Sequence, residues 1–445
     1  MESNGWSAKF KSLLTWRSLL VLLCRLVVGG TFIFSGFVKG VDLWGFYYKI
    51  GDYLTAFGWD WARPFAGLAA GFVPLFEFVL GILLLIGSFR RTAVILGLLT
   101  MVFMLPLTFY VWVANPVADC GCFGDALVLS NQTTFWKNVV LTAGLVFLLD
   151  NNKRVRSLYG PAVQWMTVVF PAVYLLIIIY WGYYVQPLID FRPYKIGTEI
   201  IASNVDSGED DFVFIYEKDG VQREFMLDSL PDDSWNFVDR KSIAKPEVQP
   251  WAQHVEPIAI YDGDVEVTAE VLPREGDVVL VLIPNISGID VATTFRLNDM
   301  NEFASESGVS LVCLTSGSED EIAQWKEFAF ADYPIFTMDD SMLKTIARGN
   351  PAIVRVIDGR IVWKSTLDSI ESDELPELFD MSFDDGEMSL ADRGRVTLVL
   401  TVTLGILGVL LLLINRLGLV IKFSIRMRRN QNKTVNLHRE VTKRV

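Results

Sequence analysis

The chain has 445 residues, of which 51% are hydrophobic, and its mean hydropathy of +0.36 is typical of a membrane protein with more than one domain. The formal net charge of −13 conceals two populations, because residues 187–393 carry 43 acidic and 16 basic residues whereas the remainder is net basic. So acidic a segment argues against nucleic acid as a partner. Four cysteines are too few for a disulfide-rich scaffold.

Six apolar runs predict membrane spans, because about 20 helical residues cross a hydrocarbon core that is ~30 Å thick. The first run ends without a small-residue cleavage site, which favours a retained span over a signal peptide. The fourth run is the shortest. The predicted spans are Ser18–Val38, Phe65–Gly87, Ala93–Ala114, Thr134–Leu149, Ala162–Val185 and Val396–Ile414.

Basic residues gather in segments that six spans would place on one side of the membrane. They precede the first span, separate the second from the third and the fourth from the fifth, and follow the sixth. By the positive-inside rule this side is the cytoplasm, so both termini are predicted to be cytoplasmic. The loop between the third and fourth spans and the acidic segment 187–393 are then predicted to face outward.

Two cysteines stand one residue apart in that outward loop, in the run Asp119-Cys120-Gly121-Cys122-Phe123-Gly124-Asp125. A disulfide at this spacing is tight, since the two Cα atoms must lie about 5.5–6 Å apart, and Gly121 allows the necessary bend. A strained, exposed disulfide is suited to exchange, which favours a redox-active pair. A static disulfide and a soft-metal site are the alternatives, although no neighbouring His or Met completes a metal site.

Three charged residues lie within or at the end of the predicted spans, where an isolated charge is costly. Arg25 and Glu77 lie at similar depths when counted from the cytoplasmic ends of their spans, so we expect an intramembrane ion pair, with either a structural or a proton- or ligand-related role. Lys39 ends the first span on the outer side, where it either snorkels or lies near Cys120 and favours a thiolate. Close helix packing is predicted at Gly29/Gly30, Gly36/Gly40 and Gly67/Gly71.

Four motifs stand out in the first third of the chain: Arg25, Phe34-Ser35-Gly36-Phe37-Val38-Lys39-Gly40, Phe76-Glu77-Phe78-Val79-Leu80-Gly81 and the 119–125 loop. Together they resemble the MauE/DoxX-type redox-associated membrane proteins over about residues 17–150. The resemblance implies a four-helix membrane bundle in the bacterial inner membrane, linked with periplasmic thiol–disulfide chemistry, in which Asp119 and Asp125 flank the pair. No cofactor is evident from the residues, and turnover would need an electron acceptor such as a quinone.

The soluble segment contains the element order of a thioredoxin-like domain. Gly349-Asn350-Pro351-Ala352 is similar to the cis-proline turn of that fold, so Pro351 is expected to follow a cis bond. The position after the first core strand, where thioredoxins carry paired cysteines, reads Pro284-Asn285-Ile286-Ser287-Gly288, and Cys313 ends a buried strand. The expected elements are strand 278–283, helix 292–307, strand 309–314, helix 319–330, strand 334–338, helix 341–347 and the hairpin 352–364.

Flanking segments complete the predicted organisation. A hairpin is expected around Asp219-Gly220 and an irregular excursion at 229–257. The tail that starts at Arg416 has nine basic residues, counting Arg416, and these are expected to attract anionic lipid. The predicted segments are 1–156 for the four-helix bundle, 157–189 for the fifth transmembrane helix, 190–257 for a strand and loop extension, 258–367 for the thioredoxin-like domain, 368–394 for an acidic linker, 395–415 for the sixth transmembrane helix and 416–445 for the basic cytoplasmic tail.

Two functions are compatible with these observations. The chain has only His254 and His438, which argues against a histidine-centred triad or a multi-histidine metal site. The first function is thiol–disulfide chemistry at Cys120 and Cys122, with the thioredoxin-like domain binding periplasmic or membrane partner proteins. The second is a non-enzymatic assembly subunit of an envelope complex, in which the cysteine pair only staples its loop.

Overall fold

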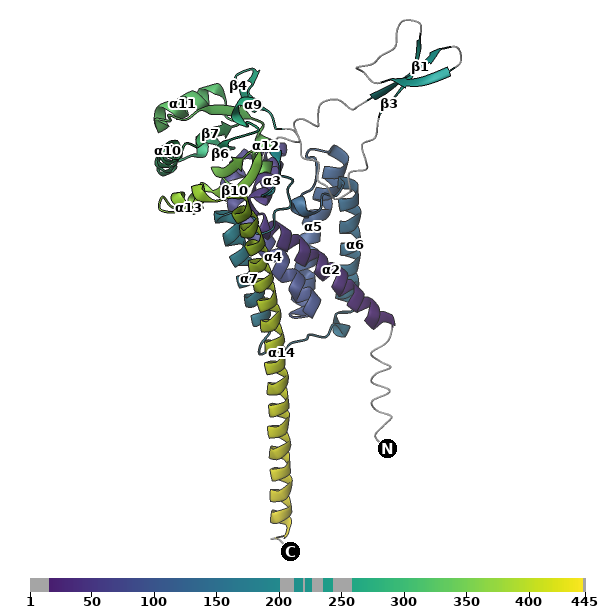
Figure 1. Ribbon diagram of the computed structural model, residues 1–445. Helices are drawn as coiled ribbons and strands as arrows, with labels where there is room; N and C mark the ends of the chain where they lie inside the picture. Colours follow the sequence, from purple (N-terminus) through teal and green to yellow (C-terminus); the bar gives the residue numbers. More distant parts are fainter. Residues whose placement is uncertain (1–15, 201–211, 219–220, 226–234, 243–257, 443–445) are drawn as a thin grey trace. The chain divides into compact units, whose positions relative to one another are not determined.

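The computed structural model describes residues 16–200, 212–218, 221–225, 235–242 and 258–442 (Figure 1). The chain divides into two compact units. The helical unit comprises Met1–Tyr183, Pro187–Ile189 and Arg393–Val445, and the α/β unit comprises Tyr184–Gln186 and Asp190–Asp392. Three parts of the predictions lie outside the described residues: Lys9 and Lys11, which are among the basic residues before the first predicted span, residues 229–234 and 243–257 of the predicted irregular excursion, and the last three residues of the tail.

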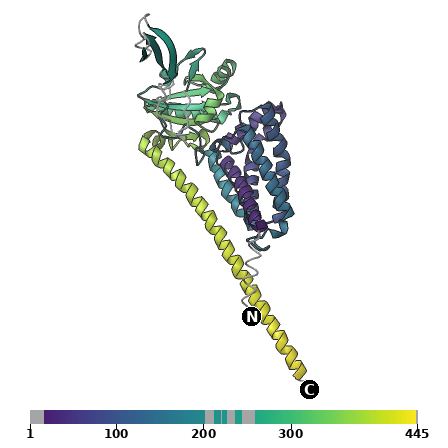
Figure 2. The ribbon, with the colours of Figure 1, turned by 90° about the vertical axis from the view of Figure 1, so that its right-hand side faces the viewer.

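The first five predicted spans of the helical unit correspond to helices whose bounds differ by a few residues, whereas α3 was not predicted and the last helix, α14, is much longer than the sixth span (Figures 1 and 2). Five helices are long and apolar enough to cross a membrane, within the described residues. The helix of the predicted fourth span, α6, is not among these five, because its first turns carry Asn131, Gln132, Lys137 and Asn138. The helices are α2 (Trp16–Val41), α3 (Leu43–Ala56), α4 (Ala66–Ile86), α5 (Arg90–Ala114), α6 (Asn131–Asp150), α7 (Met166–Tyr184) and α14 (Phe383–Thr442), with short turns η1 (Asp60–Phe65), η2 (Gly124–Ala126) and η3 (Asn152–Arg154).

Glycines allow α2 and α4 to pack backbone to backbone. A Cβ on Gly36 would lie 2.5 Å from the Phe78 nitrogen and 2.5 Å from the Pro74 oxygen, and one on Gly29 would lie 2.9 Å from the Gly81 oxygen. Such close approach is the ordinary use of small residues between membrane helices. The expected packing is therefore confirmed at Gly29 and Gly36.

The other predicted glycine contacts divide. Close helix packing is also confirmed at Gly40, where a Cβ would lie 2.8 Å from Leu175 Cδ1 of α7. Gly30, Gly67 and Gly71 have no neighbouring atom within 4 Å of a built Cβ, so the prediction of close packing at these three positions is wrong. The reason is rotational, because Gly30 lies next to Gly29 in sequence but 100° around the helix, away from α4.

The last helix is longer than predicted. α14 runs without interruption through the segments predicted as the end of a linker, a sixth span and a tail. Within the helical unit it packs on the α7 side, where Tyr174 Oη lies 2.9 Å from Thr401 Oγ1. Tyr159 Oη also donates to the Gly408 carbonyl at 2.9 Å.

The α/β unit contains a seven-stranded sheet in the order β10-β9-β6-β7-β8-β4-β5. β6 and β7 are parallel neighbours at its centre, and β9 runs antiparallel to β6 on the other side. This arrangement confirms the predicted strand–helix–strand–helix–hairpin order. The elements are β4 (Ile260–Asp262), β5 (Val265–Glu266), α9 (Thr268–Val271), β6 (Asp277–Ile283), η5 (Ile286–Gly288), α10 (Val291–Glu306), β7 (Ser310–Thr315), α11 (Glu319–Ala329), β8 (Ile335–Met338), α12 (Asp340–Ile346), β9 (Ala352–Ile357), β10 (Arg360–Thr366), η6 (Leu367–Ser369) and α13 (Leu375–Asp380).

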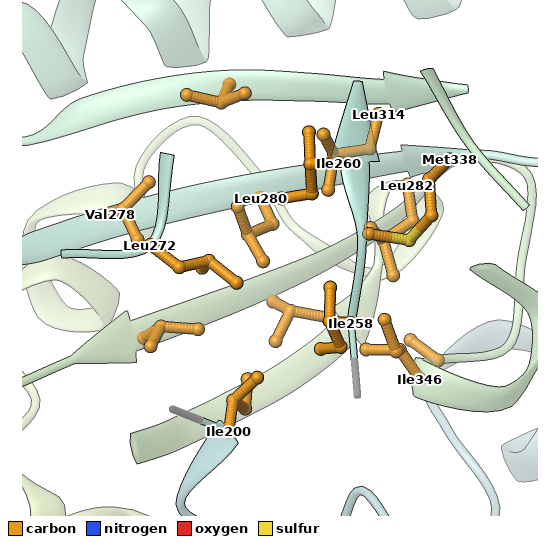
Figure 3. Close-up of a cluster of buried hydrophobic side chains, with 14 of the residues drawn as sticks. Ile200, Ile258, Ile260, Leu272, Val278, Leu280, Leu282, Leu314, Met338 and Ile346 are labelled. Carbon is orange, nitrogen blue, oxygen red and sulfur yellow. The ribbon is translucent and has the colours of Figure 1, made fainter. Parts of the chain in front are cut away.

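Apolar cores cover both faces of this sheet, because β6 is buried along almost its whole length and its side chains alternate between the faces. Figure 3 shows one of these cores, which includes residues from β4, β6, β7, β8 and α12. Its labelled members are Ile200, Ile258, Ile260, Leu272, Val278, Leu280, Leu282, Leu314, Met338 and Ile346.

Two predictions for the flanks of this domain need correction. The predicted hairpin is present as β1 (Phe212–Lys218) and β2 (Val221–Phe225), but a third strand, β3 (Asn236–Ser242), pairs with β1 inside the segment predicted to be irregular. The segment predicted as an acidic linker contains α13, whose Leu375 and Phe379 are buried in the domain core. Its many carboxylates obscured the helical spacing of these apolar residues.

Replacing Gly36 by Ala should destabilise the α2–α4 contact by about 1–3 kcal/mol, because the new methyl group overlaps backbone atoms that cannot move away easily. Gly30→Ala is the matched control, one residue away on the same helix, and should be neutral or stabilising by up to about 1 kcal/mol through helix propensity. Thermal unfolding of the two purified variants in the same detergent measures the difference. Equal midpoints would contradict the packing described here.

Candidate functional site

The two loop cysteines lie between α5 and α6, and their sulfur atoms are 2.9 Å apart as free thiols in hydrogen-bond contact. Cys120 is 7% exposed and Cys122 is 8% exposed. The expectation of an exposed pair is therefore wrong. The physical reason is a helix that the sequence analysis missed, α3, which covers the loop.

α3 holds the loop through three contacts. Lys49 Nζ donates to Asp119 Oδ2 at 2.8 Å, and Tyr53 Oη donates to the Cys120 carbonyl at 3.0 Å. A Cβ on Gly121 would lie 2.7 Å from Lys49 Cγ, and its φ of +66° is in the left-handed region that favours glycine. Asp119 also accepts from the Gly121 nitrogen at 2.7 Å, so this carboxylate both tightens the turn and binds the covering helix.

A buried ion pair lies beneath the loop, and its members are Lys39 and Glu77. Lys39 Nζ donates to Glu77 Oε1 at 3.0 Å and to Oε2 at 2.9 Å, and the two side chains are 4% and 8% exposed. Ser35 Oγ lies 2.8 Å from Glu77 Oε2 and 2.7 Å from the Cys122 carbonyl oxygen. Ser35 therefore joins the ion pair to the cysteine loop.

The predicted ion pair between Arg25 and Glu77 is wrong. The Arg25 guanidinium donates to the carbonyls of Leu84 at 3.2 Å and Leu85 at 2.6 Å, which are orphan acceptors in the last turn of α4. The start of α2 extends several residues beyond the end of α4. Residues at equal distances from these two helix ends therefore do not lie side by side, which is why the predicted pairing of Arg25 with Glu77 is wrong. Gly29 lies thirteen residues after the start of α2, yet it meets Gly81, which lies only five residues before the end of α4.

Lys39 lies in the last turn of α2, at the end of the first predicted span, but it is buried and does not snorkel. Its Nζ also lies 5.0 Å from the centre of the Phe46 ring of α3. A buried lysine needs a compensating anion, and Glu77 supplies it. The alternative role, in which Lys39 lies near the cysteines, agrees with the position of Ser35 between Glu77 and Cys122.

A second cation approaches the loop from α6. Lys137 Nζ lies 4.1 Å from the centre of the Phe123 ring, which also makes an edge contact with Phe34 at 5.2 Å. Sequence reasoning missed Lys137, Lys49, Tyr53 and Ser35 as members of the site. A usable signal was present for Lys49 and Tyr53, which share one face of a helix at i, i+4 spacing.

The pKa values of the two thiols are shifted in opposite directions. The hydrogen bond from Cys120 lowers the pKa of the Cys122 thiol, and Lys137 and Lys39 lower it further, while burial acts in the other direction. The pKa of Cys120 is raised, first by its hydrogen bond to Cys122 and then by burial, although Lys137 lowers it. These shifts favour the thiolate on Cys122 over the thiolate on Cys120.

A cavity of about 30 Å³ adjoins the ion pair and the loop. That volume is enough for a water molecule. Its lining includes Lys39 and Lys49 and three residues with carboxyl groups, Asp42, Asp119 and Asp125. Asp125 was predicted to flank the cysteines, and it borders this cavity. Within the described residues, no group of three His, Cys, Asp or Glu side chains is arranged to hold a metal ion.

The α/β unit contains the predicted cis bond between Asn350 and Pro351. In the turn where related folds carry cysteines, the Asn285 nitrogen donates to Asn350 Oδ1 at 2.9 Å, and Asn350 Nδ2 donates back to the Asn285 carbonyl at 2.9 Å. Ser287 Oγ also donates to Glu321 Oε1 at 2.6 Å. Cys313 is fully buried in β7, and burial raises its pKa to about 12, so it is an inert core residue.

Comparisons with known proteins agree with this division. Residues 17–150 match the family described as methylamine utilisation protein MauE, and residues 211–245 match a domain of unknown function. No curated protein matches the chain. The helical unit is therefore similar to MauE over somewhat less than a third of the chain.

Solved structures resemble the chain over a similar share of its length. One, assigned provisionally as a protein disulfide isomerase from Bacteroides thetaiotaomicron, has 15% identity and a TM-score of 0.24 and covers 30% of this chain and 90% of its own. The bacterioferritin comigratory protein of Xanthomonas campestris has 10% identity and a TM-score of 0.21, covering 27% and 85%. Peroxiredoxin Q of the same organism has 9% identity and a TM-score of 0.20, covering 32% and 90%.

In the reduced protein, a small alkylating reagent should modify Cys122 before Cys120. A lowered pKa keeps Cys122 as thiolate when the pH falls below the range of an ordinary thiol, whereas a raised pKa keeps Cys120 protonated until the pH is well above it. Fragment mass spectrometry between the two positions, over a pH series, measures the order. Equal rates, or faster labelling of Cys120, would contradict it.

Proposed function

We propose that this chain is a membrane protein of thiol–disulfide exchange, in which Cys120 and Cys122 alternate between a dithiol and a disulfide. The observation that carries the proposal is the contact of 2.9 Å between the two sulfurs beside the cations Lys39 and Lys137. A nearby cation favours the thiolate, which is the reactive form in disulfide exchange. The similarity of residues 17–150 to MauE agrees with this assignment.

The exchange begins when a substrate thiolate attacks the sulfur of Cys120 in the oxidised loop. The bond between Cys120 and Cys122 breaks, and Cys122 leaves as a thiolate, because the sulfur with the lower pKa leaves faster. A second substrate thiolate then displaces Cys120 from the mixed disulfide. The substrate gains a disulfide and the loop becomes a dithiol.

An electron acceptor must restore the loop disulfide. We propose a compound of the quinone class, which takes two electrons and two protons from the dithiol to become a quinol. The membrane location of the helical unit supports an acceptor that is soluble in lipid. Each cycle then transfers one electron pair from a substrate dithiol to the acceptor.

We also propose that the bundle has six spans in the bacterial inner membrane, with both termini in the cytoplasm. α6 supports this count, since its 20 residues are long enough for a ~30 Å core and it runs beside α5, with Leu145 against Gly97. The positions of Lys and Arg support the orientation, which places the cysteine loop and the α/β unit in the periplasm. There an oxidised pair can persist.

The α/β unit is proposed to bind partner proteins. Its cis-Pro351 turn and the absence of cysteine from the 284–288 segment support a binding role over an exchange role of its own. The mutual hydrogen bonds of Asn285 and Asn350 fix the two segments that border this turn. The basic C-terminal tail is proposed to lie against anionic lipid.

A second function has one observation in its favour. Both thiols are buried, and α3 ties their loop through Lys49 and Tyr53, as expected if the pair were only structural. In that case the chain is a non-enzymatic assembly subunit, and its complexes survive the loss of both cysteines.

Replacing Cys122 by Ser should trap mixed disulfides in the reverse direction of the exchange. The Cys120 thiol attacks the disulfide of an oxidised partner protein, one partner sulfur leaves as a thiolate, and Cys122, whose attack on the Cys120 sulfur would release the partner, is missing. Cys120→Ser is the matched control and should trap at least several-fold less. Non-reducing gels and mass spectrometry of the membrane fraction, after acid quenching, measure the adducts. Unchanged partner complexes in the double variant, together with no adducts in either single variant, would favour the assembly subunit.

A further inference from the structure

The ion pair beneath the cysteine loop has a hydrogen-bond arrangement that accommodates two protonation states. Ser35 has one hydroxyl proton but lies within 2.8 Å of two oxygens, Glu77 Oε2 and the Cys122 carbonyl. The carbonyl can only accept. When the Ser35 hydroxyl donates its proton to the Cys122 carbonyl, it can only accept from Glu77. Its contact with Glu77 is then favourable only if the Glu77 carboxyl group is protonated and donates to Ser35 Oγ.

The charges of the cluster change with the state of the loop. With uncharged sulfurs, as in the free thiols of this structure or in a disulfide, Lys39 and Glu77 form a neutral pair. A Cys122 thiolate adds a second anion beside the buried cation Lys39, while the partly exposed Lys137 lies against Phe123 of the loop. Lys39 cannot balance both Glu77 and the thiolate, and a buried charge without compensation is costly, so a proton on Glu77 restores the balance of the buried pair.

We propose that Glu77 takes up this proton when reduction of the loop leaves Cys122 as a thiolate, and returns it when the loop is oxidised, while Lys39 changes its anionic partner from Glu77 to Cys122. This proposal rests on the proposed thiol–disulfide function. It gives Glu77 the role of a proton-holding residue and Lys39 that of a positioning cation. Neither role is required of a structural ion pair.

The two half-reactions balance. In the first, a substrate dithiol gives two electrons and two protons, which reduce the loop disulfide and leave one proton on Cys120 and one on Glu77, with Cys122 as the thiolate. In the second, the quinone takes the electron pair together with the protons of Cys120 and Glu77, the sulfur–sulfur bond forms and Glu77 returns to the carboxylate. The net charge of the site is unchanged in each step.

The cavity beside Lys39 has room for a water molecule near the ion pair. It is about 30 Å³ in volume and is bordered by Lys39 and by the carboxyl-bearing residues Asp42, Asp119 and Asp125, while Glu77 lies behind Lys39 and does not line it. The titratable and charged groups around the pair come from every adjacent element: Lys39 of α2, Lys49 and Tyr53 of α3, Glu77 of α4, Lys137 of α6, and Asp119, Asp125 and Cys120 of the loop. Of these groups, Glu77 is the carboxylate that Lys39 binds directly.

Infrared difference spectroscopy of the full-length protein in lipid nanodiscs tests the proposal. The spectrum of protein reduced with a phosphine minus that of oxidised protein should contain the carbonyl band of a protonated carboxyl group, sensitive to exchange into heavy water. Glu77→Gln should abolish the band. The matched control Asp119→Asn removes a carboxylate of the same site and should retain it.

Lys39→Met should also abolish the infrared difference band. Without the cation, Glu77 has no ionic partner in either redox state, so it keeps its proton throughout and the difference band disappears. Glu77→Asp should retain a shifted band, which keeps the test valid if Glu77→Gln does not fold. The double variant Cys120→Ser, Cys122→Ser should show no band, because no redox change occurs.

Absence of the band in the wild-type protein, or its survival in Glu77→Gln, would overturn the proposal. The outcome is separable from that of the proposed function, since the phosphine reduces the loop without any partner protein. If the band is present and depends on Glu77, the proton coupling is supported even where no partner adduct is captured. If adducts form but the band is absent, only the role of Glu77 fails.

Discussion

The helical unit depends on the burial of one lysine. Lys39 stands at the end of α2, where its charge would ordinarily reach solvent, yet α3 folds over it and leaves it 4% exposed. The buried charge of Lys39 is tolerated because its Nζ donates to both carboxylate oxygens of Glu77 on α4. The glycine contacts at Gly29 and Gly36 bring α2 and α4 close enough for this pairing. The cysteine loop then rests on the pair through Ser35.

The same constraint explains which parts of the site were predictable. Cys120, Cys122, Lys39 and Glu77 stand out in the sequence because charged and thiol residues are rare in apolar runs. The partner of Glu77 could not be predicted in the same way. Whether Arg25 or Lys39 pairs with Glu77 depends on the offset between α2 and α4 along their axes, and no local sequence pattern encodes that offset. Burial of the thiols was equally hidden, since it comes from α3, whose 14 residues are too few for a span and too aromatic for a typical loop.

The α/β unit was easier to predict, because its signals are local. Strands such as β6 are continuous apolar runs, and β7 and α11 follow with turn residues at each junction, so their bounds agree with the sequence within one or two residues. The prediction failed where many charged residues obscure the helical spacing of the apolar ones. α13 contributes Leu375 and Phe379 to the core from within an acidic run, and Arg355 binds the carbonyls of Leu378 and Met381.

Burial of the cysteines has a consequence for how exchange proceeds. A disulfide can react only with a thiolate that approaches along the line of the sulfur–sulfur bond, and sulfurs that are 7% and 8% exposed offer little access. The cover is held by a half-buried ion pair between Lys49 and Asp119 and one hydrogen bond from Tyr53. Half-exposed contacts of this kind contribute about 1 kcal/mol or less each, so a partner protein that binds α3 can displace them. In the proposed exchange, selectivity for partners would therefore reside in access to the pair, while the buried charges would set its reactivity.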